Sequence, residues 1–274
     1  MEIRQEIKRR AADIEARIAP FLPQEKGFQQ TVLDAMEYSV FAGGKRLRPM
    51  LMEASYQMFD GTNPAIDDFM AAIEMIHTYS LIHDDLPAMD NDDFRRGKPS
   101  CHKAFGEAEA ILAGDALSVL PFEIIADDNS LTDMQKIRII SVLAKAVGKN
   151  GMIGGQIIDM ENEKRNDVDD ENLRNMYRHK TGELISVSCM MGCICAGADD
   201  EAIAAASEYG YKLGLAFQII DDILDVTSTA EELGKPIGSD SQENKTTFVT
   251  LYGVEKAQEI AGNITEEAML LLEK

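Results

Sequence analysis

The sequence is short of cysteine and of basic residues, and each shortage excludes a class of protein. The four cysteines, at positions 101, 189, 193 and 195, have neither metal-ligand spacing nor the pattern of a disulfide framework. Cys189 and Cys193 lie four residues apart in an apolar helical segment, and we expect both to be reduced core residues. The 27 basic residues stand against 48 acidic ones, which gives a net charge of −21. A protein of that charge is a poor partner for nucleic acid or for an anionic membrane surface.

Long hydrophobic runs are also missing. The most apolar stretch, residues 184–198, is shorter than the roughly 20 residues that a membrane-spanning helix needs. Residues 1–19 carry charges throughout and lack the apolar centre of a secretory signal. We expect a soluble cytoplasmic protein with no stable membrane insertion, in which 184–198 forms a buried core helix.

Helical periodicity is what the sequence has in abundance. Apolar residues recur every three or four positions, strict alternation is rare, and hydrophobic residues make up 45% of the chain. Turn-forming residues interrupt the pattern, but no long linker or strong repeat is visible. We expect a single all-α domain over residues 1–274, with its chemistry in the middle of a helical bundle. The predicted helices are 2–18, 27–41, 45–59, 65–86, 107–127, 132–150, 169–197, 200–228 and 254–272.

Two acidic clusters lie inside apolar helical segments, rather than in a polar tail. Carboxylates crowded on a packed helix face repel one another, and burying them without partners is costly, so they require cations. Carboxylates without adjacent His or Cys pairs suit hard cations, which predicts Mg²⁺ first and Mn²⁺ second. The first cluster contains Asp84, Asp85 and Asp90, and the second contains Asp221, Asp222 and Asp225.

Helical geometry says how each cluster could act. At about 100° per residue, Gln218, Asp221, Asp222 and Asp225 fall within roughly a 100° arc of one face. In the first cluster Pro87 disrupts the helix, and we expect a bend that returns Asp90 toward Asp84. Mg²⁺ commonly completes its coordination with substrate phosphates. We therefore expect the two clusters to face one cavity and to bind a phosphate-bearing ligand.

Two basic turns are consistent with such a ligand. Residues 43–49 read Gly-Gly-Lys-Arg-Leu-Arg-Pro, and Arg-Arg-Gly-Lys follows the first acidic cluster at 95–98. Arginine offers a planar fork for phosphate oxygens, and lysine offers a point charge. The alternative is ordinary helix capping and surface ion pairing. Weaker cationic candidates lie at Lys180-Thr181, Lys235 and Lys245.

In combination these segments resemble the trans-isoprenyl diphosphate synthases, and most closely the bacterial farnesyl diphosphate synthases. Their motifs occur in the family's order and cover most of the chain. They lie at residues 43–49, 76–90, 95–99, 112–117, 155–159, 180–184, 217–225 and 234–238. The resemblance implies an all-α homodimer with a deep central cavity and three Mg²⁺ ions. It also implies the condensation of isopentenyl diphosphate with an allylic diphosphate.

The resemblance further implies a role for individual residues. It makes Asp84, Asp90 and Asp221 metal ligands, and Asp85 and Asp225 supporting or alternative ligands. The isopentenyl diphosphate positions are Lys45, Arg48, His77 and Arg96, with Gly44 in the same substrate-binding turn. The allylic diphosphate positions are Arg95, Lys180, Lys235 and, as an addition, Lys245. Thr181 and Gln218 match residues whose oxygens lie beside the developing carbocation.

Product length depends on the residues before the first acidic cluster. In the family, the positions four and five residues before this cluster commonly form the floor of the product pocket. Here they are Ser80 and Tyr79, and a bulky Tyr beside a small Ser resembles the type that makes the C15 product, farnesyl diphosphate. The alternative for Tyr79 is that it is only a packed aromatic residue at a helix interface. The competing product is geranylgeranyl diphosphate.

Three other functions compete with a synthase. A terpene cyclase would need no isopentenyl diphosphate site, and Lys45, Arg48 and Arg96 argue against it. A non-catalytic partner subunit of a prenyl synthase would usually lack one acidic cluster. A structural metal-binding bundle would leave the basic turns unexplained. The resemblance also implies one more C-terminal helix than the sequence contains, and in relatives that segment helps to close the cavity. The resemblance therefore supports family membership more strongly than it supports full activity of this chain.

Overall fold

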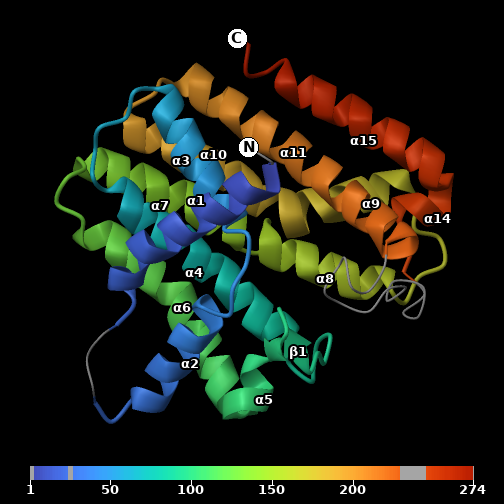
Figure 1. The fold of residues 1–274 in the computed structure, drawn as a ribbon. Coiled ribbons are helices and arrows are strands. Elements are labelled where there is room, and N and C mark those ends of the chain that lie inside the picture. The colour runs from blue at the N-terminus through green and yellow to red at the C-terminus, as the bar shows by residue number, and fades with distance from the viewer. Residues whose placement is uncertain (1–2, 24–26, 229–244, 274) are drawn as a thin grey trace. The chain divides into compact units, whose positions relative to one another are not determined.

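The computed structural model describes residues 3–23, 27–228 and 245–273, and these residues are mostly helical (Figure 1). Within those ranges the strands are a short antiparallel pair, with Phe94 opposite Pro99. Two compact units divide the chain at residues 1–140 and 141–274. No helix in the described ranges combines the length and the apolarity needed to cross a membrane.

The first unit contains the N-terminal helices and the strand pair. Its elements are α1 (Ile3–Ile18), the 3-10 helix η1 (Ala19–Phe21), α2 (Gln30–Val40), α3 (Leu47–Met58), α4 (Ile66–Asp84), β1 (Phe94–Arg95), β2 (Lys98–Pro99), α5 (Cys101–Phe105), α6 (Glu107–Asp127) and the first half of α7 (Asp133–Val147). Helix α4 is buried around most of its circumference and packs against α2, α3 and α6. Its sequence is apolar on all sides, as a helix inside a bundle requires.

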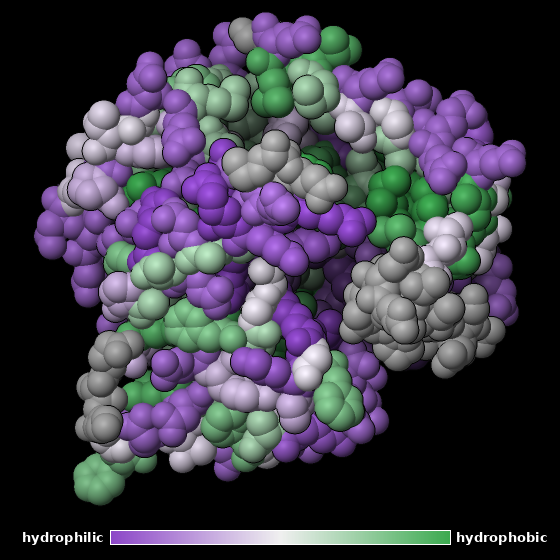
Figure 2. All heavy atoms as spheres, in the orientation of Figure 1, coloured by the Kyte–Doolittle hydropathy of each residue, from purple (hydrophilic) through white to green (hydrophobic). Residues whose placement is uncertain are grey.

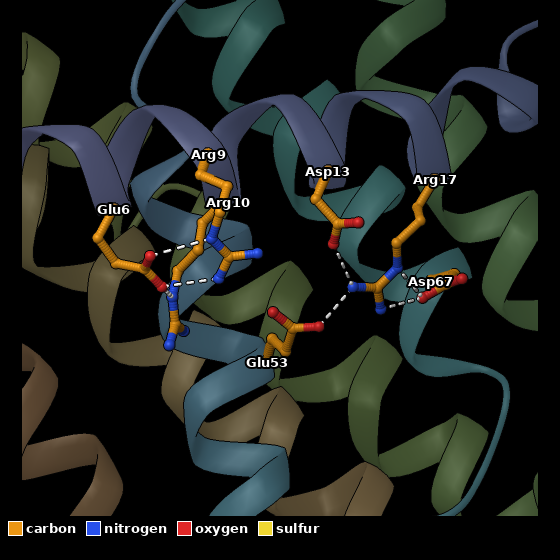
Figure 3. Close-up of polar contacts among 7 residues, drawn as sticks. All are labelled: Glu6, Arg9, Arg10, Asp13, Arg17, Glu53 and Asp67. Carbon is orange, nitrogen blue, oxygen red and sulfur yellow. Dashed lines mark hydrogen bonds and ion pairs between the residues drawn. The ribbon is translucent and has the colours of Figure 1, made fainter. Parts of the chain in front are cut away.

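An ion-pair network joins α1 to two neighbouring helices of the first unit. Figure 3 shows the Arg17 guanidinium between Asp13, Glu53 of α3 and Asp67 of α4. Its nitrogens lie 2.5 Å from Glu53 Oε1 and 2.5 Å from Asp67 Oδ1. Elsewhere α1 presents hydrophilic side chains to solvent, which form the purple band across the middle of Figure 2. Charge on one face and apolar contacts on the other thus fix α1 in the unit.

The second unit contains the remaining helices. They are the end of α7, α8 (Met152–Asn162), α9 (Asp170–Tyr177), the π-helix η2 (Arg178–Gly182), α10 (Glu183–Ala196), α11 (Asp200–Thr227), α14 (Phe248–Tyr252) and α15 (Val254–Met269). Helix α11 packs against α10 on one side and α15 on another. A core that includes Leu173, Ile219 and Phe248 joins α9, α11 and α14.

The structure confirms the all-α prediction and corrects several element boundaries. The helix predicted over 45–59 begins at Leu47, because Arg46 has a left-handed φ of 49°. The helix predicted over 169–197 is interrupted by η2. The predictions omitted α5, α8 and α14. All four cysteines are buried thiols, which confirms the prediction for Cys189 and Cys193.

Candidate functional site

The first acidic segment makes the predicted bend. Helix α4 ends at Asp84, and the N–H of Asp90 donates a hydrogen bond to the carbonyl oxygen of Asp84 over 2.9 Å. The N–H of Asn91, whose φ is 54°, donates to the carbonyl oxygen of Leu86 over 3.1 Å. The chain therefore folds back after Pro87, and the backbones of Asp84 and Asp90 meet. Both of these aspartates reach the surface of the first unit.

The neighbouring carboxylate, Asp85, has a different environment. It is buried, and the Nε of Arg95 donates to its Oδ1 over 2.9 Å, with a second bond from Arg95 Nη2. Burial raises the pKa of Asp85, and the hydrogen bonds from Arg95 oppose that rise. In this structure Asp85 thus orients Arg95, which also reaches Asp92.

The basic turn at 43–49 contains one structural arginine. Arg46 is fully buried, and its Nη1 donates to Glu74 Oε1 over 2.6 Å. Its Nη2 donates to the carbonyl oxygen of Val40 over 2.7 Å and to Glu15 Oε1 over 3.0 Å. Arg46 is therefore committed to the core of the first unit, whereas the side chain of Lys45 is exposed.

Arg48 and His77 form a different kind of basic group. Arg48 Nε and His77 Nδ1 are buried atoms with no hydrogen-bond partner among the described residues. Burial lowers the pKa of His77 well below its usual value, and the charges of Arg48 and Arg96 add to this effect. Burial likewise lowers the pKa of Arg48 to about 10. Polar atoms left unpaired beside a surplus of positive charge are suited to binding an anion.

Gly44 allows Arg96 to join this basic group. Arg96 Nη1 donates to the carbonyl oxygen of Gly43, and a Cβ built on Gly44 would lie 2.6 Å from Arg96 Cζ. Gly44 also has a φ of 132°, which L side chains rarely adopt. Two segments distant in sequence are thereby brought together.

The residues predicted to set product length lie one turn before the acidic segment. Tyr79 is 6% exposed, and its hydroxyl has no hydrogen-bond partner among the described residues. Burial, with the charge of Asp84, raises the pKa of Tyr79 to about 12. Ser80 is partly buried, and its Oγ donates to the carbonyl oxygen of His77 over 2.9 Å.

The second unit has its own polar pocket, and several of the predicted residues line it. Lys180, Gln218, Asp221 and Lys245 line it together. Thr181 Oγ1 donates to Gln218 Oε1 over 3.0 Å, so the predicted pair is in contact. The other lining residues are Asp159, Asn162, Glu163, Met176, Tyr177, Asp222, Thr246 and Thr247.

Asp225 is buried on α11, one turn beyond Asp221, and it is not among the residues that line the pocket. Lys235 lies outside the described residues.

Three acidic residues that line this pocket, Asp159, Glu163 and Asp222, were not among the predicted site residues, and the first two pair with its lysines. Lys180 Nζ lies 2.5 Å from Asp159 Oδ2, and Lys245 Nζ lies 3.2 Å from Glu163 Oε1. Both acids belong to α8 or directly follow it, and Gly155 of α8 contacts the backbone of Lys180 so closely that a Cβ would not fit. The Gly-Gln-Ile-Ile-Asp motif at 155–159 was the available signal for Asp159.

The candidate ligand residues suit a metal ion whose coordination is completed by the substrate. In the described residues, no three His, Cys, Asp or Glu side chains are arranged as a ready metal site. Asp84, Asp90 and Asp221 instead offer partly or fully exposed carboxylates. Mg²⁺ typically binds through one or two carboxylates and takes its other ligands from water and phosphates. The residues present therefore fit Mg²⁺ rather than a metal held entirely by protein ligands.

The fold is that of an all-α protein of the isoprenoid synthase class, and comparisons with known proteins agree. Residues 29–270 match the family model "Polyprenyl synthetase". The chain is 49% identical over 228 residues to a farnesyl diphosphate synthase of Geobacillus stearothermophilus, covering 82% of this chain and 76% of that protein. It is 46% identical over 236 residues to a chloroplastic geranylgeranyl pyrophosphate synthase of Catharanthus roseus, covering 86% of this chain.

The solved structures include a geranyltransferase from Helicobacter pylori complexed with magnesium and isoprenyl diphosphate. It has a TM-score of 0.84 and 33% identity to this chain, and the match covers 98% of this chain and 90% of that one.

The chain spans only 66% of the length of the Catharanthus protein. The chain belongs to the polyprenyl synthetase family, which is a family of prenyltransferases.

Proposed function

We propose that this protein is a short-chain trans-prenyl diphosphate synthase, which condenses isopentenyl diphosphate with dimethylallyl or geranyl diphosphate. The observation that carries the proposal is the group formed by Arg48, His77 and Arg96, which leaves buried polar atoms unpaired beside positive charge. A binding site for a second diphosphate distinguishes a synthase from a terpene cyclase. The proposal also includes farnesyl diphosphate as the product, a homodimer and three Mg²⁺ ions.

In the proposed mechanism, the first unit binds isopentenyl diphosphate. Arg48 and Arg96 are suited to its diphosphate oxygens, and Lys45 adds an exposed charge beside them. His77 stays neutral at neutral pH because burial lowers its pKa, so its unpaired Nδ1 can exchange a hydrogen bond without adding charge. The double bond at the uncharged end of isopentenyl diphosphate then acts as the nucleophile.

The allylic diphosphate is assigned to the acidic segments and their lysines. Asp84, Asp90 and Asp221 would hold Mg²⁺, with Asp85 and Asp225 in support. When bound, Mg²⁺ neutralises charge that accumulates on the departing diphosphate. Arg95, Lys180 and Lys245 stabilise the same charge directly, and Lys235 is proposed for the same role.

The reaction exchanges a C–O bond for a C–C bond and ends with the loss of a proton. The allylic C–O bond breaks, and the double bond of isopentenyl diphosphate supplies the electron pair for the new C–C bond. The oxygens of Thr181 and Gln218 are in contact at 3.0 Å, and the proposal assigns to them the stabilisation of the allylic cation. Loss of a proton to the released diphosphate restores a double bond and leaves an allylic diphosphate that is five carbons longer.

The proposal is tested by a condensation assay with labelled isopentenyl diphosphate. The protein is incubated with dimethylallyl, geranyl or farnesyl diphosphate, with Mg²⁺ or with excess EDTA, and the labelled products are separated by chain length. We expect Mg²⁺-dependent elongation of the two shorter primers to the C15 product. Absence of elongation from every primer in saturating Mg²⁺ would refute the proposal.

Product length is a separate prediction, because relatives of similar identity are named as synthases of either the C15 or the C20 product. Tyr79→Ala is expected to shift the main product from C15 toward C20, since it removes a bulky, buried side chain one turn before Asp84. Tyr79→Phe keeps the ring and should keep the C15 product. If Tyr79→Ala is folded and active but still stops at C15, the pocket floor lies elsewhere.

The two adjacent arginines are expected to serve different substrates. Arg96→Ala should raise KM for isopentenyl diphosphate by about ten- to a hundredfold, the loss expected from one or two charge-assisted hydrogen bonds. Arg95→Ala should instead raise KM for the allylic substrate. Steady-state kinetics with each substrate varied in turn measures both values. Equal effects of either variant on both substrates would contradict this assignment.

A further inference from the structure

The second aspartate of the 221–225 segment is buried and accepts hydrogen bonds from two other elements of the second unit. Asp222 is 3% exposed, and the hydroxyl of Tyr177 donates to its Oδ2 over 2.8 Å while lying 3.0 Å from its Oδ1. The backbone N–H of Phe248 donates to the same Oδ2 over 3.1 Å. One carboxylate therefore joins α11 to the end of α9 and to the start of α14, which Figure 1 shows side by side.

Each of the joined elements contains or directly borders a residue of the pocket. Tyr177 directly precedes the π-helix η2, which contains Lys180. Phe248 directly follows Thr247, and Lys245 lies two residues before that. Asp222 itself follows Asp221. The carboxylate thus lies where the three pocket-bearing segments meet in the second unit.

Additional contacts make this junction rigid. The rings of Tyr177 and Phe248 pack with centroids 5.8 Å apart, and the Arg174 guanidinium lies 5.2 Å from the Phe248 ring centroid. The Thr247 side chain accepts a hydrogen bond from the Thr250 N–H, and the two residues form a capping box that starts α14. Removing the Asp222 carboxylate would leave the Phe248 N–H and the Tyr177 hydroxyl without this acceptor.

We propose that Asp222 is a positioning residue that fixes the Lys180 and Lys245 segments around the diphosphate pocket. The proposal rests on the proposed function for its kinetic consequence. Its structural consequence, the anchoring of residues 245–252, holds whatever the pocket binds. Two readouts therefore test it separately.

The kinetic test uses Asp222→Asn and Tyr177→Phe, each of which weakens the junction and keeps the shape of the side chain. Either variant should raise KM for the allylic diphosphate about tenfold, and leave KM for isopentenyl diphosphate unchanged. The double variant should be no worse than Asp222→Asn, because both changes remove the same hydrogen bond. Fully additive effects, or equal effects on both substrates, would overturn the proposal.

The structural test is amide hydrogen exchange over residues 245–252, which needs no turnover. Exchange in this segment should become faster in Asp222→Asn and in Tyr177→Phe. It should stay at the wild-type rate in Asp221→Asn, and in the control Ser188→Ala, which removes a buried hydrogen bond to the Leu184 carbonyl on α10. Unchanged exchange in folded Tyr177→Phe would overturn the proposal, even if the protein proved inactive with every prenyl substrate.

Discussion

Asp221→Asn is expected to lower kcat for prenyl transfer by about a thousandfold or more, and Asp84→Asn should do the same. Each substitution replaces a charged oxygen that would hold Mg²⁺ against the leaving diphosphate, and losses of this kind of charge stabilisation are typically that large. Both side chains are partly exposed, and Asn has nearly the same shape as Asp. The fold should therefore be retained.

Steady-state rates in saturating Mg²⁺, with circular dichroism as a check of folding, measure this effect. Asp167→Asn is a matched control in the second unit, because Asp167 is an exposed aspartate paired with Arg165. It should leave kcat unchanged. A near-normal kcat in either Asp84→Asn or Asp221→Asn would remove that residue from the metal-binding set.

Arg46→Ala is expected to destabilise the protein by about 3–5 kcal/mol, the usual loss when one partner of a buried ion pair is removed. Arg46 and Glu74 are both almost completely buried, so the variant leaves the Glu74 carboxylate without its main partner. Urea unfolding followed by circular dichroism measures the change in the free energy of unfolding.

Lys45→Ala is the control for this prediction, because Lys45 is the exposed cation next to Arg46. It should change stability little while weakening isopentenyl diphosphate binding. In addition, the double variant Arg46→Ala with Glu74→Ala should be more stable than the sum of the two single losses predicts. Strict additivity would contradict the account of Arg46 as a structural residue.

Most helices were predictable because their apolar periodicity is long and regular, as in α4 and α11. Helix α8 was not, because Gly154 and Gly155 lower its helix propensity. Its formation depends on contact with a distant segment, since Gly155 packs on the backbone of Lys180. The π-helix at 178–182 was also missed, because one widened turn hardly changes the apolar pattern of the helices on either side.

The chemistry of the candidate site was predictable from the sequence, but the roles of the individual residues were less so. Charge and spacing singled out the two acidic segments and the basic turns. They could not tell Arg46 from Lys45 and Arg48, because the partner of Arg46 is Glu74 on another helix. Likewise, Asp221 and Asp222 share one broad arc of α11. Asp222 is distinguished by hydrogen bonds from Tyr177, 45 residues earlier in the chain, and from Phe248, 26 residues later, which helix geometry alone does not reveal.

The most direct test of the proposed function is to measure released diphosphate and labelled prenyl product in the same reaction. The wild-type protein is given dimethylallyl diphosphate, labelled isopentenyl diphosphate and Mg²⁺. A prenyl diphosphate synthase releases one diphosphate for each isopentenyl unit incorporated, so the two amounts should rise together in a one-to-one ratio. Diphosphate release without incorporation of the label would contradict the account and indicate ionisation of the allylic substrate alone, as in a cyclase.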